Sequence, residues 1–448
     1  MAADHLEERL NDFDPAVRRE ALTELLRAGA SFPTPKQEVN IHFHTFFSFN
    51  GAGYSPSRIA WEAKKYGLEV AGIVDFDVLD GFQEFLEVGE LLGLKTTVGL
   101  ETRVYVPDYA DKVITSPNEP GVHYFMAQGC YKLPEPGSEE ESTLKMMAHT
   151  ARERNKAVMQ RMNDYLGEVV LDYERDVLPL TPAGNATERH LLLAYDLKSR
   201  EILGDDAARF WAGVLGMSKE QTKALMSDRP TIHERLRSNL IKFGGVGYIP
   251  PESGSFPTVE QVVSMARGIG ALPTNTWLDG TSEGERDIKA LLELLTSKGV
   301  AAMNIIPDRN WNIKNPEEKA VKVARLCEAV EATRAFDLPL SVGTEMNKTG
   351  LPFVDNFAAP ELAPFVEDFV RGAQFFWGHT LLARWADFGY FSPAADAAFG
   401  SDRRRKNEFY AQVGATARPS QRLYDRLREL AGSAGLENIL RVVIELEV

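Results

Sequence analysis

The stretch Val39-Asn40-Ile41-His42-Phe43-His44 decides how this chain is interpreted. It predicts a strand, and side chains two residues apart on a strand point to the same face. His42 and His44 can therefore reach one metal ion from a single rigid strand. Imidazole binds zinc, iron, manganese or copper, so the remaining ligands must decide which metal the site takes. The rest of the chain supplies candidate ligands at the ends of other predicted strands.

The composition is that of an ordinary globular protein, with 44% hydrophobic and 26% charged residues among 448. A net charge of −15 argues against general nucleic-acid binding, because clustered Lys and Arg bind phosphate backbones. Cys130 and Cys327 are expected to be unpaired thiols, as in a reducing compartment. The charged start of the chain lacks the apolar core of a signal peptide, and no apolar run approaches the ~20 residues that span a bilayer. We therefore expect a cytoplasmic protein without membrane contact.

Strands and helices alternate through most of the chain, which predicts a parallel α/β sheet with crossover helices. A helical N-terminal extension is expected over residues 1–37, before the alternation begins. The α/β barrel is expected over residues 38–352, with a helical insertion at about 135–256. Residues 353–448 are expected to be a helical segment packed on the barrel. Its aromatic stretch Phe375-Phe376-Trp377 should pack against the barrel or against a second subunit of a homo-oligomer.

Reactive groups in α/β barrels lie on the loops at the carboxyl ends of the strands. The polar residues at the predicted strand ends are His42, His44, Asp75, Asp77, Glu101, His123, Asn275, Asp308, Arg309 and Glu345. Histidines and carboxylates together suit a hydrolytic site with one or two metals. Each residue alone also has a structural interpretation, since a strand-end aspartate such as Asp75 or Asp77 is commonly a helix N-cap. Four of the other five histidines, His5, His149, His233 and His379, are expected to be surface or packing residues.

The order of the motifs resembles the PHP family, the polymerase and histidinol phosphatase family of metal-dependent phosphoesterases, over roughly residues 38–350. HFHTFFSFN is similar to the family's HxHTxxSDG motif, IVDFDVLDGFQEF to its TDHDTxxG stretch, and VGLE to its GxE motif. RNKAVMQRMN and ERHLLLAY resemble a helix and a histidine motif of the nucleotide-processing branch, and SVGTEMNKTG lies where the family has GSDxH. The resemblance implies a distorted (β/α)7 barrel with helical extensions and a helical insertion.

The resemblance also implies a set of metal ligands. The first metal would be held by His42, His44, Glu101 and Glu345, with Glu345 in place of the family's Asp. A second metal would share Glu101 and add His123 and His190. The family's third-metal positions carry Phe49 (or Asn50), Phe76 and Asn347 here. The implied cofactors are therefore two divalent ions, of zinc, manganese or iron.

The expected activity is hydrolysis of a small phosphorylated metabolite or nucleotide by a hydroxide that two metals activate. Arg309 is the predicted catalytic phosphate partner, with Arg189, Arg103 and Lys348 as further candidates. Asp75 would act as a general acid or would orient a metal ligand, and we favour the orienting role. Two alternatives stay open. One is hydrolysis of a non-phosphate ester or amide, suggested by the two phenylalanines, and the other is a non-catalytic barrel that binds metal or ligand.

Overall fold

Seven strands lie in sequence order in one sheet of the computed structural model, which describes residues 2–252 and 254–446. The strands are β1 (Val39–Phe43), β2 (Val70–Phe76), β3 (Lys95–Tyr105), β4 (Val122–Gln128), β5 (Leu272–Trp277), β6 (Ala302–Ile305) and β7 (Leu340–Val342). A backbone bridge between Phe43 and Glu345 joins the end of β1 to the chain just after β7. The sheet is thereby nearly closed into a barrel, which confirms the predicted distorted seven-stranded fold.

The direction of β4 differs from the all-parallel prediction. Strand β4 runs antiparallel to both β3 and β5, while the other neighbouring pairs are parallel. The connection between β3 and β4 contains only a 3-10 turn at Pro107–Tyr109 (η1) and no α-helix that could serve as a crossover, so the chain returns antiparallel to β3. An antiparallel strand starts where its parallel neighbours end. His123, the second residue of β4, therefore still lies toward the end at which the parallel strands finish, here called the barrel mouth.

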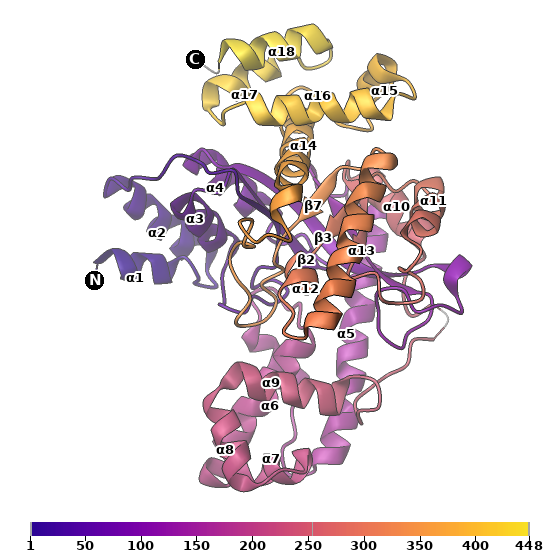
Figure 1. Ribbon diagram of the computed structural model, residues 1–448. Helices are drawn as coiled ribbons and strands as arrows, with labels where there is room; N and C mark the ends of the chain where they lie inside the picture. The colour runs from indigo at the N-terminus through magenta and orange to yellow at the C-terminus, as the bar shows by residue number, and fades with distance from the viewer. Residues whose placement is uncertain (1, 253, 447–448) are drawn as a thin grey trace.

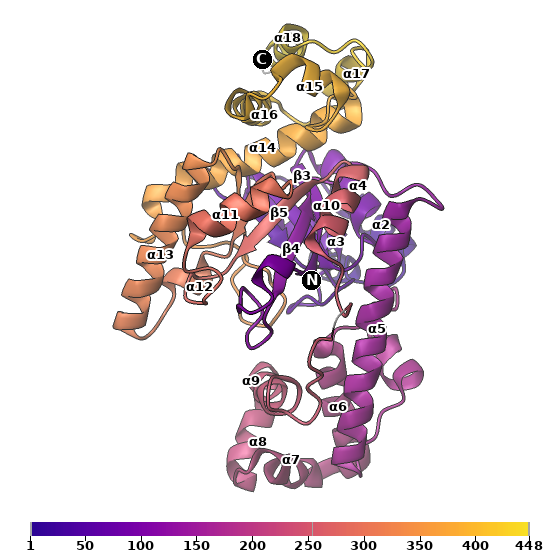
Figure 2. The same ribbon diagram turned by 90° about the vertical axis from the view of Figure 1, so that its right-hand side faces the viewer.

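Helices cover the outside of the barrel (Figures 1 and 2). They are α3 (Pro56–Tyr66), α4 (Phe82–Leu92), α10 (Val259–Gly268), α11 (Ile288–Ser297), α12 (Asp308–Trp311) and α13 (Pro316–Ala335). Helix α3 shows why they form here, since Ser55 caps its first turn and Gly67 ends it in a left-handed conformation. The N-terminal extension is two helices, α1 (Ala2–Arg9) and α2 (Pro15–Arg27), separated where Asp14 caps α2. Buried Arg18 pairs with Glu84 and ties α2 to α4.

The insertion between β4 and β5 has a hydrophobic core of its own. Its helices are α5 (Glu139–Leu166), α6 (Glu188–Leu203), α7 (Ala207–Leu215), α8 (Lys219–Ser227) and α9 (Arg229–Leu236), with π-helical turns η2 (Tyr173–Val177) and η5 (Arg237–Ile241) and 3-10 turns η3 (Leu178–Leu180) and η4 (Gly204–Asp206). Asn185 donates to the backbone oxygens of Phe47 (3.1 Å) and Phe76 (2.9 Å). These bonds attach the insertion to the barrel mouth.

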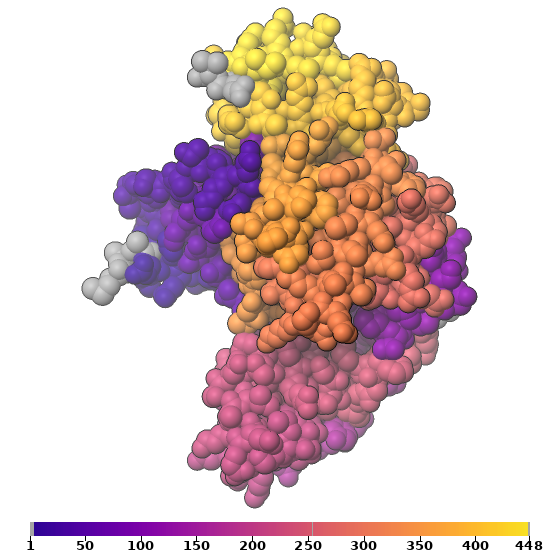
Figure 3. All heavy atoms as spheres, in the orientation of Figure 1, coloured from indigo at the N-terminus to yellow at the C-terminus, as the bar shows by residue number. Residues whose placement is uncertain are grey.

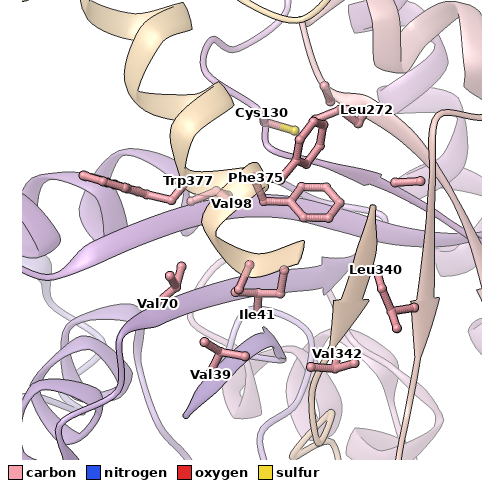
Figure 4. Close-up of a cluster of buried hydrophobic side chains, with 14 of the residues drawn as sticks. Val39, Ile41, Val70, Val98, Cys130, Leu272, Leu340, Val342, Phe375 and Trp377 are labelled. Atoms are coloured by element: carbon pink, nitrogen blue, oxygen red, sulfur yellow. The ribbon is translucent and has the colours of Figure 1, made fainter. Parts of the chain in front are cut away.

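The C-terminal helices lie at the opposite end of the molecule from the insertion (Figure 3). They are α14 (Val366–Trp385), α15 (Pro393–Phe399), α16 (Arg403–Thr416), α17 (Gln421–Arg428) and α18 (Leu436–Glu445), preceded by the turn η6 (Ala363–Phe365). Helix α14 packs Phe375 and Trp377 among Ile41, Val98 and Leu340 of the strands (Figure 4). His379 bonds through Nε2 to the carbonyl oxygens of Gly129 and Gly270, both at 3.0 Å. These residues follow β4 and precede β5, so α14 closes the barrel floor and His379 is a packing residue.

In the part of the chain that the structure describes, no helix has the length and apolar character that crossing a membrane requires.

Gly372→Ala should strongly destabilise the protein, because α14 contacts β7 so closely. A Cβ atom at Gly372 would lie 1.8 Å from the carbonyl oxygen of Leu340, so the helix would have to move off the barrel floor. Overpacking at a backbone contact is expected to cost about 3 kcal/mol of unfolding free energy, measured by urea denaturation. Gly213→Ala in α7 is the control, since its Cβ would meet nothing within 4 Å. An unchanged urea midpoint for Gly372→Ala would contradict this packing.

Candidate metal centre

His42, His44 and Glu101 converge at the barrel mouth, and we call them the metal cluster. Each offers one ligand atom, and these atoms lie within 4.8 Å of one another. Glu101 Oε2 is 3.1 Å from His44 Nε2 and 3.5 Å from His42 Nε2. All three atoms are buried and have no hydrogen-bond partner among the described residues. Buried polar atoms normally have partners, so three unpartnered ligand atoms around one point fit a divalent cation.

In each cluster histidine, the hydrogen bond at Nδ1 determines that Nε2 is the nitrogen free to bind a metal. Asn304 donates through its amide to Ser341, so its Oδ1 accepts from His42 Nδ1 at 3.2 Å. His44 Nδ1 lies 3.1 Å from Ser48 Oγ, and that hydroxyl donates in turn to Asp75 at 2.6 Å. In the neutral rings both Nδ1 atoms therefore carry the proton, which leaves the Nε2 lone pairs directed at the cluster. Such outer partners commonly orient metal-binding histidines.

The Asp75 carboxylate forms hydrogen bonds with the turn that follows β1. It accepts hydrogen bonds from the Thr45 backbone N–H (2.7 Å), the Thr45 hydroxyl (2.7 Å) and the Ser48 hydroxyl (2.6 Å). Its side chain is buried, and burial raises the pKa of its carboxyl. The geometry supports the orienting role, because Asp75 acts on His44 through Ser48.

The pKa values of Glu101 and His44 in the metal cluster depend on the charges of their neighbours. Burial alone would raise the pKa of Glu101, but His42 and His44 lower it to about 2. Burial would also lower the pKa of His44, but Glu101, Asp75 and Glu345 together raise it. Glu101 is therefore an anion over the whole physiological pH range, and it draws positive charge to the cluster.

Glu345 lies beside the cluster and is paired with Arg309. Its backbone is in the left-handed region with φ at 63°, where its N–H donates to His42 and its carbonyl accepts from His44, both at 2.8 Å. Its carboxylate lies 3.0 Å from Arg309 Nη2. Burial alone would raise the pKa of Glu345, but Arg309 and His42 lower it. Glu345 thus contacts a guanidinium, and only the other three predicted first-metal ligands form the cluster.

The structure holds His123 and His190 in other hydrogen bonds. His123 bonds through Nδ1 to the Thr115 hydroxyl (2.9 Å) and through Nε2 to Asn275 (2.7 Å). His190, on α6, accepts a hydrogen bond at Nδ1 from the Thr187 backbone N–H at 3.0 Å, which caps the helix. Burial lowers the pKa of both histidines to about 4, so both rings are neutral. The sequence could not show these bonds, which depend on the insertion and on β5.

Aromatic rings occupy the positions where the family resemblance places third-metal ligands. Phe76 stacks on His44 with ring centroids 4.4 Å apart. Phe49 packs edge to face on His190, with centroids 5.1 Å apart. Both phenylalanines and Asn347 line the cavity above the cluster. This side of the site is therefore apolar.

A cavity of about 420 Å³ lies between the barrel mouth and the insertion, and Glu101 and Glu345 form part of its wall. Its basic wall residues are Arg103, Arg154, Arg189, Arg237, Lys242, Arg309 and Lys348. Four of these, Arg103, Arg189, Arg309 and Lys348, are candidates from the sequence alone, whereas Arg154, Arg237 and Lys242 are not. The missed residues lie in the insertion, where charged residues on helices look like a solvated surface. Asp77 also lines the cavity, and burial raises its pKa to about 6.

Comparisons with known proteins find remote similarity in fold. No family model and no curated protein matches the chain. One similar structure is a protein from Bifidobacterium adolescentis inferred to be a metal-dependent phosphoesterase, with 16% identity and a TM-score of 0.49 over 75% of this chain and 98% of that one. Another is an amidohydrolase from Chromobacterium violaceum with bound sulfate and no metal, with 12% identity and a TM-score of 0.47 over 74% of this chain and 96% of that one. At identities this low, neither similarity assigns an activity to this chain.

Ser48→Ala should weaken metal binding because it removes the hydroxyl between His44 and Asp75. Loss of a partner that orients a ligand typically costs about 10–100-fold in metal affinity, and we expect this range in a competition titration against a chelating dye. Thr45→Val is the matched control, since the Thr45 hydroxyl also bonds to Asp75 but contacts neither cluster histidine. Equal affinities for Ser48→Ala and the wild type would show that this hydrogen bond does not orient His44.

Metal affinity should increase with pH because a proton and a metal ion compete for His44 Nε2. The neighbouring carboxylates raise the pKa of His44, so its ring is partly protonated near neutral pH in the metal-free protein. Glu101 is already ionised there and contributes no pH dependence. We expect Zn²⁺ affinity to rise from about pH 6 to about pH 8 and to level off once His44 is neutral. An affinity independent of pH across this range would contradict binding at His44.

Proposed function

We propose that the chain is a metal-dependent hydrolase that cleaves a small phosphoester. The observation that carries this proposal is the convergence of His42 Nε2, His44 Nε2 and Glu101 Oε2, all buried and unpartnered in the described structure. A divalent ion of zinc, manganese or iron suits this donor set, and when bound it supplies Lewis-acid chemistry for hydrolysis. The cluster borders a cavity rather than a closed core, so a substrate can reach it.

The cavity wall supports an anionic substrate. Arg309 is half-exposed while it contacts Glu345, so its remaining N–H groups can donate to phosphoryl oxygens. Arg189 pairs with Glu234 and Arg237 with Glu188, which holds these guanidinium groups in place at the wall. Residues of the insertion form the wall of the cavity opposite the barrel mouth, so basic side chains from both parts face the same space. The protein would thus bind and orient the phosphoryl group with its own side chains.

A second candidate is hydrolysis of a non-phosphate ester or amide. Phe49 and Phe76 favour it, because both line the cavity and make one side of the site apolar. A non-catalytic barrel that binds metal or another ligand is the third candidate, since the unpartnered cluster atoms would bind a cation in either case.

A substrate panel separates the three candidates. The metal-loaded protein is expected to hydrolyse p-nitrophenyl phosphate or bis-p-nitrophenyl phosphate faster than p-nitrophenyl acetate or a p-nitroanilide. His42→Ala should lower kcat/KM by more than about 100-fold, beyond the effect of residues that only orient a ligand. His149→Ala, an exposed histidine on α5, is the control and should leave the rate unchanged. Turnover of only the acetate or the anilide would favour the second candidate, and metal binding without turnover the third.

A further inference from the structure

His190 lacks a free lone pair for a second metal ion. The Thr187 backbone N–H donates to His190 Nδ1 at 3.0 Å, in the capping box that starts α6. A backbone N–H can only donate, so Nδ1 must hold a lone pair and the neutral ring carries its proton on Nε2. One nitrogen is therefore already in a hydrogen bond and the other is protonated. A metal bound at Nε2 would require the ring proton on Nδ1, which would break the hydrogen bond between Nδ1 and the Thr187 backbone N–H.

His123 is held from both sides of its ring. Its two nitrogens bond to the Thr115 hydroxyl and to Asn275 Oδ1, at 2.9 and 2.7 Å, and the residue is completely buried. Thr115 also accepts from the Tyr124 backbone N–H at 2.7 Å, which directs its hydroxyl proton toward His123 Nδ1. A metal ion could bind His123 only by displacing one of these partners.

Glu345 already has a cation beside it. Its backbone is fixed to β1 by two hydrogen bonds, so its carboxylate cannot move far from the cluster. Arg309 Nη2 lies 3.0 and 3.4 Å from the two carboxylate oxygens. A guanidinium does not lose its proton in proteins, so this positive charge is permanent. A second divalent ion next to Glu345 would have to displace it or stand close to a like charge.

We propose that this site holds one divalent ion, bound by His42, His44 and Glu101, and that the Arg309 guanidinium supplies the positive charge that a second ion would provide. The proposal rests on the proposed hydrolase function and specifies its charge arrangement. Because the Arg309 side chain is 46% exposed, it faces the cavity as well as Glu345. One guanidinium thus holds the Glu345 carboxylate and presents N–H donors to an anionic substrate.

The experiment is a Zn²⁺ titration of the metal-stripped full chain by calorimetry, with bound metal confirmed by elemental analysis. We expect one equivalent in the wild type. His190→Gln and Glu345→Gln should also bind one equivalent, since neither side chain is a ligand. His190→Gln is the most informative variant. It removes the imidazole, and a glutamine at this helix position can still form the capping box. Circular dichroism of each variant checks that it is folded.

Arg309→Met tests the role of the guanidinium itself. It removes a positive charge next to the site and frees the Glu345 carboxylate, so Zn²⁺ should bind about tenfold more tightly or in a second equivalent. Lys242→Met removes the same charge from the insertion wall, where Lys242 pairs with Glu188, and should leave Zn²⁺ binding close to the wild type. Unchanged binding in Arg309→Met would overturn the assigned role of Arg309.

The outcomes separate this inference from the proposed function. Two equivalents in the wild type would overturn the single-ion site even if phosphoesters are hydrolysed, and the loss of one of them in His190→Gln or Glu345→Gln would identify a ligand of the second ion. No bound ion in the wild type would overturn both proposals. One equivalent without hydrolysis of any substrate in the panel would leave the single-ion site supported and contradict the hydrolase.

Discussion

Two backbone hydrogen bonds join the end of β1 to the chain just after β7, and the arrangement of the metal cluster depends on them. They run between Glu345 and the two cluster histidines, so the groups that close the barrel also position the ligands. Glu345 adopts a left-handed conformation to make them, which costs a residue with a Cβ roughly 1–2 kcal/mol. Gly343 permits the close approach, because a Cβ there would lie 2.2 Å from Asn40 Oδ1. Barrel closure and metal-site geometry are therefore one constraint.

The local environment suits the cluster to a cation. Glu101 stays ionised between two imidazoles, while Phe76 covers one face of His44 and excludes water from it. Electrostatic attraction grows as the surrounding dielectric falls, so an apolar wall next to an anionic ligand strengthens the attraction for a cation. Phe76, at a position where the resemblance places a third-metal ligand, thus has a physical role beside His44 in this chain.

The sequence predicted the parts of the site that depend on local pattern. His42 and His44 lie at the end of β1, and Glu101 lies where β3 passes the last residue of β2, so the alternation of strands and helices is enough to bring the three residues together. The direction of β4 depended on a connection whose path the pattern does not determine. The bonds of His123 and His190 depend on Asn275 and Thr187, and no spacing rule relates those residues to a metal site. Arg154 and Arg237 belong to helices whose charged faces could equally have been solvent-exposed.

The cavity lies between two hydrophobic cores rather than within one. The barrel core holds the metal cluster, while the insertion has a core of its own around Met162, Tyr195 and Trp211. Residues on the insertion side of the cavity can therefore be substituted without repacking the barrel core. In the proposed hydrolase, the metal ligands and the insertion side of the cavity wall would thus belong to separately packed parts of the chain. Over evolutionary time, that side of the wall could change while the metal ligands stay the same.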